Sequence, residues 1–139
     1  MSDTHEPLPL RSAEVEEIPD WECRKLLGSE RVGRLGVVVG GRPEIFPVNY
    51  TLDETGAVVF EIGAGTKVAG AVNHRVVFEI DHPTQRGGWS VVVHGVAQHP
   101  SAESLRFPNV AHASWVRGRP HTVRIHPSRI SGRRLVHPG

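Results

Sequence analysis

Glycine and proline interrupt this chain so often that long regular elements have little room to form. Fifteen Gly and eleven Pro are spread over 139 residues, and valine-rich runs lie between them. Gly and Pro favour turns, whereas β-branched residues favour strands. A chain of this length is also typical of one domain. The pattern therefore predicts a single, mainly β domain built from many short strands.

Six segments between these turns have strand character. They are residues 31–39, 42–51, 57–62, 76–81, 89–97 and 122–130. The Gly40-Gly41 pair predicts a hairpin between the first two, and Pro127 predicts a bend or bulge in the last. Short helices are predicted at residues 21–27, 66–73 and 101–107. This set fits a six-stranded antiparallel barrel with a few short helices, in a domain of residues 20–139 after an N-terminal arm of residues 1–19.

The second predicted strand contains two prolines, Pro43 and Pro47. A proline has no backbone N–H to donate to a neighbouring strand, so within sheets it is confined to edges and bulges. We therefore expect this strand to lie at an edge, at a bulge or beside a gap that a ligand faces.

Charge and composition argue against several classes of function. Sixteen Lys and Arg against fifteen Asp and Glu give a net charge of +1, too small for a nucleic-acid-binding surface. No apolar stretch reaches the roughly 20 residues that span a bilayer, and no leader pattern opens the chain, so a cytoplasmic protein without a membrane partner is expected. Cys23 is the single cysteine and the nine histidines lack metal-ligand spacing, so no metal site is predicted.

The run at residues 63–71, GAGTKVAGA, places a flexible turn, a hydroxyl and an ammonium ahead of a predicted helix. Backbone N–H groups at a helix start lack intrahelical partners and carry the positive end of the helix dipole, so they attract anions. Thr66 and Lys67 would then complete a phosphate site. The alternative is a solvated loop lysine among glycines that serve turn geometry.

Residues 89–97 are largely apolar on both faces of the predicted strand. One face can enter the barrel, but the other must be covered by something else. A second copy of the chain is the simplest cover, so a homodimer is predicted.

Several motifs follow one another in an order that is more specific than any one of them. They are Val32-Gly33-Arg34-Leu35, the segment Arg42 to Tyr50, Gly65-Thr66-Lys67, Phe78-Glu79-Ile80-Asp81 and the segment Gly88 to Gly95. This order, over about residues 20 to 98, resembles the pyridoxamine 5'-phosphate oxidase-like family, whose members are FMN-binding split barrels.

The resemblance implies a split β-barrel that holds FMN between the two subunits of a homodimer. Its implied cofactor-binding residues are Pro47, Val48, Asn49 and Tyr50 beside the isoalloxazine ring, Thr66 and Lys67 at the phosphate, and Trp89 and Ser90 near the same cofactor. By the same likeness, Trp115 and Arg117 would reach the flavin from the second subunit.

The function that follows is a flavin-dependent oxidoreductase that acts on a small molecule by hydride transfer at flavin N5. No side chain is identified as catalytic. One alternative is a reductase of the same fold that uses the deazaflavin F420, whose acidic tail would need a groove formed by Arg75, Arg86, Arg117 and Arg119. Others are a non-catalytic flavin or haem carrier, with His74 or His94 on the haem iron, and a barrel without cofactor.

Overall fold

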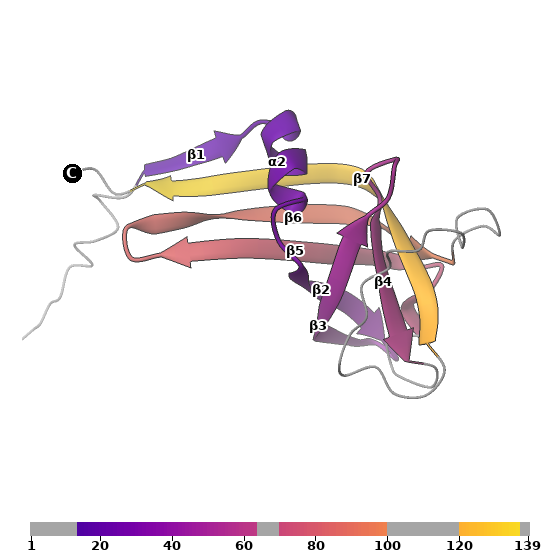
Figure 1. Cartoon of the computed structure of the whole chain (residues 1–139). Helices are drawn as coiled ribbons and strands as arrows, with labels where there is room; N and C mark the ends of the chain where they lie inside the picture. Colours follow the sequence, from indigo (N-terminus) through magenta and orange to yellow (C-terminus); the bar gives the residue numbers. More distant parts are fainter. Residues whose placement is uncertain (1–13, 64–69, 100–119, 137–139) are drawn as a thin grey trace, which may run out of the picture.

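The computed structural model describes residues 14–63, 70–99 and 120–136 (Figure 1). Its elements are β1 (Glu14–Ile18), α2 (Asp20–Leu27), β2 (Val32–Val39), β3 (Arg42–Leu52), β4 (Val58–Gly63), β5 (Arg75–Thr84), β6 (Gly87–Gln98) and β7 (Pro120–Val136). The mainly β expectation is therefore confirmed. The predicted helix at residues 101–107 and the first half of that at 66–73 lie outside the described residues. Within the described part of the chain, no helix is long and apolar enough to cross a membrane.

The strands form one antiparallel sheet that closes on itself. The order is β1-β7-β4-β3-β2-β5-β6, and an additional pairing of β6 with β7 completes a ring of six strands. Closure of a sheet removes the open edges that an antiparallel sheet otherwise leaves. The predicted six-stranded split barrel is thus confirmed, and β1 adds a seventh strand outside the ring.

Strand β1 lies within the segment that sequence analysis placed in an N-terminal arm. Its sequence, EVEEI, leaves four of five residues exposed and buries only Ile18. Such a run has no alternation of apolar and polar residues to mark it as a strand. Its ladder to β7 instead sets Glu16 and Glu17 opposite Arg134 and Arg133, so pairing with a distant strand accounts for its structure.

Strand β7 is a single element of 17 residues where sequence analysis expected a shorter one. Its ladder with β6 pairs His94 with Arg129 and Gly95 with Pro127, which leaves Ser128 as an extra residue. The Ser128 hydroxyl donates to the His94 carbonyl oxygen at 3.0 Å. The bulge predicted at Pro127 is therefore confirmed, and it lets β7 bend and continue instead of ending.

The interior of the ring is filled by the inward-facing residues of all its strands. Phe60, Phe78 and Ile125 are fully buried, and the rings of Tyr50 and Phe78 meet edge to face with centroids 4.8 Å apart. Helix α2 covers the β6–β7 side of the barrel (Figure 1). Its Cys23 is buried, and burial raises the pKa of this thiol.

The turn between β3 and β4 is organised by Asp53. One carboxylate oxygen accepts hydrogen bonds from the Thr55 amide at 2.8 Å, the Thr55 hydroxyl at 2.6 Å and the Ala57 amide at 3.0 Å. The other oxygen lies 3.3 Å from Nε of Arg124 on β7. Burial works against the charged form, but these hydrogen bonds and the guanidinium together lower the pKa of Asp53.

We predict that Gly33→Ala destabilises the barrel by about 1–3 kcal/mol, because a methyl group there would overlap the Phe78 ring. Gly36→Ala is the matched control on the same strand. There the nearest atom, the Val77 carbonyl oxygen, is 3.6 Å away, so no loss is expected. Urea unfolding at fixed protein concentration measures both. Equal midpoints for the two variants would contradict the packing at Gly33.

We also predict that Asp53→Asn flattens the loss of stability in acid. A carboxylate whose pKa is lowered on folding stabilises the protein above its ordinary pKa of 3.8, and this stabilisation is lost as the pH falls through the lowered value. Melting temperatures between pH 6 and pH 2.5 test this. Glu54→Gln, at the exposed neighbouring position, should keep the slope of the natural protein. Identical slopes for all three proteins would show that Asp53 is not the group responsible.

Candidate functional site

The first part of the candidate site is the place where β3 and β4 separate, which we call the split. Strand β3 pairs with β2 over eight residues, from Arg42 (opposite Val39) to Asn49 (opposite Val32). It pairs with β4 over only three, from Tyr50 (opposite Phe60) to Leu52 (opposite Val58). On its other edge β4 pairs with β7 along its whole length, from Val58 opposite Ile125 to Gly63 opposite Pro120. The segment of β3 before Tyr50 therefore has one of its backbone edges turned toward the split.

Both prolines of β3 have their ring nitrogens on this edge. The Tyr50 amide donates to the Arg31 carbonyl at 2.9 Å, toward the β2 side. Amide direction alternates along a strand, so the nitrogens of Pro43, Ile45 and Pro47 point away from β2. The expectation that this strand borders an edge or gap is confirmed. Of these three nitrogens, only that of Ile45 carries a hydrogen.

The structure places the four predicted residues of β3 differently from one another. Pro47 is exposed, Asn49 is partly buried, and Val48 and Tyr50 are buried in the core. The Tyr50 hydroxyl donates to the Leu27 carbonyl at 2.5 Å, and burial raises its pKa. Tyr50 thus holds α2 against the barrel, so what it can offer a ligand at the split is its backbone.

Strand β4 ends at Gly63, on the β4 side of the split. The predicted phosphate residues Thr66 and Lys67 follow within four positions, and both lie outside the described residues. Trp115 and Arg117 lie outside them as well. What the structure shows is that β4 ends at Gly63, beside the split that the Pro47–Tyr50 segment borders.

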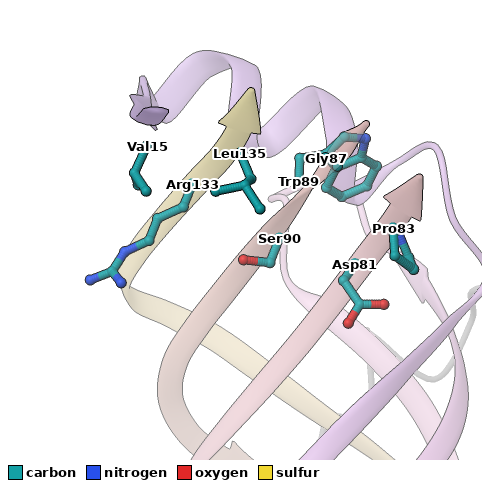
Figure 2. A pocket seen from close by; sticks show the side chains of 9 residues that line it. Val15, Asp81, Pro83, Gly87, Trp89, Ser90, Arg133 and Leu135 are labelled. Carbon is teal, nitrogen blue, oxygen red and sulfur yellow. The ribbon is translucent and has the colours of Figure 1, made fainter. Parts of the chain in front are cut away.

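The second part of the candidate site is on β6. Trp89 and Ser90 are consecutive in the strand, so their side chains point to opposite faces. The Trp89 ring stacks on His82 of β5, with centroids 6.0 Å apart and planes at 18°. Ser90 faces outward, directly between Asp81 of β5 and Arg133 of β7 in the ladders (Figure 2).

Ser90 lies in a pocket of about 250 Å³ on the outer face of the barrel. We call it the β6 pocket. Its lining comes from β1, β5, β6 and β7 and consists of Val15, Asp81, Pro83, Gly87, Gly88, Trp89, Ser90, Arg133 and Leu135 (Figure 2). Of these residues, sequence analysis selected only Trp89 and Ser90.

A charged cluster adjoins the β6 pocket. Nη1 of Arg34 lies 2.9 Å from Glu79 and 3.2 Å from Asp81. Burial, together with the neighbouring Asp81, raises the pKa of Glu79 in spite of Arg34. No three His, Cys, Asp or Glu side chains in the described part of the chain group as ligands for a metal ion.

The two parts of the candidate site lie apart within one chain. In the ring, β2 and β5 stand between β3 and β6. Three strand spacings amount to about 14 Å. The structure brings Pro47 to Tyr50 together at the split, and Trp89 with Ser90 at the β6 pocket, but it does not bring these two groups together.

Sequence analysis missed Arg34, Asp81 and Arg133 as site residues, although Arg34 and Asp81 stand in quoted motifs. Each is an ordinary charged residue at a strand position that alternation assigns to the solvent face. Only the register of β5, β6 and β7 shows that Asp81 and Arg133 flank the same serine.

Comparison with known proteins agrees with this geometry. An uncharacterised protein of Mycobacterium tuberculosis, Rv0080, is 33% identical over 139 aligned positions, which cover 92% of this chain and 90% of that protein. The structure of the FAD binding protein from Mycobacterium smegmatis is 34% identical, with a TM-score of 0.70 over 87% of this chain and 98% of that one. A FAD-binding protein from Mesorhizobium loti is 26% identical, with a TM-score of 0.73 over 90% and 99%.

The family comparison covers nearly all of the fold. Residues 19–134 match the family model described as pyridoxamine 5'-phosphate oxidase. The match begins just before α2 and ends within β7, so it takes in the complete ring, the split and the β6 strand. The chain therefore belongs to the pyridoxamine 5'-phosphate oxidase family.

Proposed function

We propose that the protein is a flavin-dependent oxidoreductase that binds FMN, or the FMN half of FAD, at the split between β3 and β4. The observation that carries this proposal is the separation of these strands beside Gly63, which precedes the Gly-Thr-Lys motif in the sequence. Two relatives with the same fold, at 34% and 26% identity, are FAD-binding proteins by name.

The residues at the split fit a flavin. The backbone edge of β3 presents carbonyl oxygens and the Ile45 amide, which suit the donors and acceptors on the polar edge of an isoalloxazine ring. Thr66 and Lys67 would hold the phosphate through a hydroxyl and an ammonium. A flavin bound there would supply hydride transfer at N5, while the protein supplies orientation and electrostatics.

The geometry is less favourable to F420. Arg75 opens β5, whereas Arg86 lies in the turn between β5 and β6, at the opposite end of this hairpin. Ten intervening residues of extended chain span about 30 Å. These two arginines therefore do not line one short groove in a single chain. Arg117 and Arg119 lie outside the described residues.

A homodimer would unite the two parts of the site, and the outer face of the barrel offers a surface for it. Val38 on β2 and Ile45 on β3 are 62% and 72% exposed. They border a shallow groove of about 260 Å³ whose other apolar residues include Pro43 and Val77. Exposed apolar surface of this kind is typical of an interface. We therefore propose a partner subunit that covers this groove; a cytoplasmic location and a small-molecule substrate stay predictions.

The absorption spectrum of freshly purified protein, with mass analysis of what heat releases, tests the proposed function. Two flavin bands and the mass of FMN or FAD would support it. A single band near 420 nm with an F420 mass, or a haem Soret band, would replace the cofactor. A flavin that no nicotinamide cofactor reduces at a useful rate would favour a carrier over an enzyme.

We predict that Lys67→Ala weakens FMN binding roughly tenfold to a hundredfold, because a charge-assisted hydrogen bond to the phosphate is lost. Lys25→Ala is the matched control, since Lys25 is the other lysine of the chain and lies exposed on α2. Titration of the apoproteins with FMN, followed by flavin fluorescence, gives both affinities. Equal losses in the two variants would remove Lys67 from the site.

We predict that Ile45→Glu converts the protein to a monomer at micromolar concentration, because a carboxylate would have to be buried in the proposed interface. Trp21→Glu is the control. Trp21 is 66% exposed, but it lies on α2, away from the β2–β3 face. Sedimentation velocity gives the mass of each species. A natural protein that is itself a monomer, or an Ile45→Glu dimer, would contradict this interface.

A further inference from the structure

The β6 pocket has charged walls of opposite sign and no assigned ligand. Asp81 and Arg133 stand on either side of Ser90, one on β5 and the other on β7 (Figure 2). Val15 and Leu135, 61% and 40% exposed, supply apolar surface at the β1–β7 end. We propose that this pocket binds a small zwitterion, with its anionic group on Arg133 and its cationic group on Asp81.

The Asp81 wall keeps a negative charge because its neighbours do not cancel it. Arg34 is a single guanidinium shared between two carboxylates, Glu79 at 2.9 Å and Asp81 at 3.2 Å. When both carboxylates are ionised, the cluster of three carries one net negative charge. The side chain of Asp81 is 34% exposed, so this charge is accessible from the pocket.

The Arg133 wall supplies the positive charge. Arg133 is exposed, and Glu17 of β1 is its partner in the ladder. No ion pair joins Arg133 to another described residue, whereas Arg134, its neighbour in the chain, is engaged by Glu22 of α2. The guanidinium of Arg133 is thus available for a carboxylate or phosphate, the groups that its planar fork binds best.

The size of the pocket limits the ligand. Its volume of about 250 Å³ is below the range of pockets that enclose drug-sized molecules, so a whole flavin does not fit within it. The ladder positions of Asp81 and Arg133 are two strand spacings apart, about 10 Å. A short chain with an ammonium at one end and an acid at the other matches both limits, and the Ser90 hydroxyl can donate to or accept from its middle.

As a ligand site the pocket stands on this geometry alone. Its use as the substrate site of a flavin enzyme rests on the proposed function, and it would give that enzyme a zwitterionic substrate class. A failure of the proposed ligand site can be distinguished from a failure of the proposed flavin function. Ligand binding is measured on protein without flavin, and flavin binding is measured without ligand.

The test is a titration of the full-length protein with glycine, 4-aminobutanoate and 6-aminohexanoate, followed by two-dimensional amide NMR. Butanoate and butylamine are the single-charge probes. We expect at least one amino acid to bind about threefold to fivefold more tightly than either single-charge probe, with shifts at the backbone amides of Trp89 and Ser90. Arg133→Gln and Asp81→Asn should each lower its affinity by a similar factor and abolish the preference.

Two matched variants keep the result specific. Arg129→Gln removes an exposed arginine of the same strand that does not line the pocket, and Glu54→Gln removes an exposed carboxylate of the β3–β4 turn that does not line it either. Both should retain the affinity of the natural protein. Equal affinities for the single-charge probes and the amino acids would overturn the proposal. Losses of affinity in these controls as large as in Arg133→Gln would overturn it as well. Displacement of the amino acid by FMN would also overturn it, since the pocket would then belong to the flavin.

Discussion

The barrel depends on the ability of β7 to pair with three strands. Its first residues pair with β4, residues from Arg124 onward pair with β6, and the segment Gly132 to Val136 also pairs with β1. A strand that serves two neighbours in succession must bend, and the extra residue at Ser128 provides that bend. Ring closure, the attachment of β1 and the walls of the β6 pocket therefore have a common origin.

Closure on one side of the barrel contrasts with separation on the other. Strand β4 pairs with β7 along its whole length but with β3 over only three ladder pairs, so the segment of β3 before Tyr50 has no β4 ladder on that backbone edge. Such an edge invites pairing with other chains. Pro43 and Pro47 remove two amide donors from that edge, and the Tyr50 side chain anchors α2 beside it. Features that protect against aggregation also leave carbonyl oxygens for a ligand.

Local patterns predicted most of the strands, because turn residues and β-branched runs act over a few positions. The hairpin at Gly40 and Gly41 is an example, since both residues adopt the left-handed backbone that such turns require. Strand β1 and the full length of β7 were not predictable in this way. Glu14–Ile18 has no apolar alternation, and the residues after Ile130 continue the strand only because β6 and β1 lie on either side. Long-range pairing decides both.

The candidate site was predictable only in part for the same reason. The motifs identified Pro47 to Tyr50 and Trp89 with Ser90. No motif indicates that the Tyr50 hydroxyl donates a hydrogen bond to the Leu27 carbonyl oxygen. Nor does any motif indicate that Asp81 and Arg133 flank Ser90. Both depend on the register between strands and on which face of the strand each side chain occupies. The face alternates from one residue to the next, and a single bulge changes it for every residue that follows.

Register also limits how the two parts of the site can cooperate. Strands in a closed ring keep their spacing unless ladder hydrogen bonds break, so in one chain the split and the β6 pocket stay three strand spacings apart around the ring, a path of about 14 Å. A ligand that contacts both in a single chain would have to cross the outer surface of β2 and β5, past the Arg34 cluster. The proposed partner subunit would remove this difficulty if it brought its own β6 pocket to the first chain's split. Dimer formation and cofactor binding would then be one linked equilibrium, in which each stabilises the other.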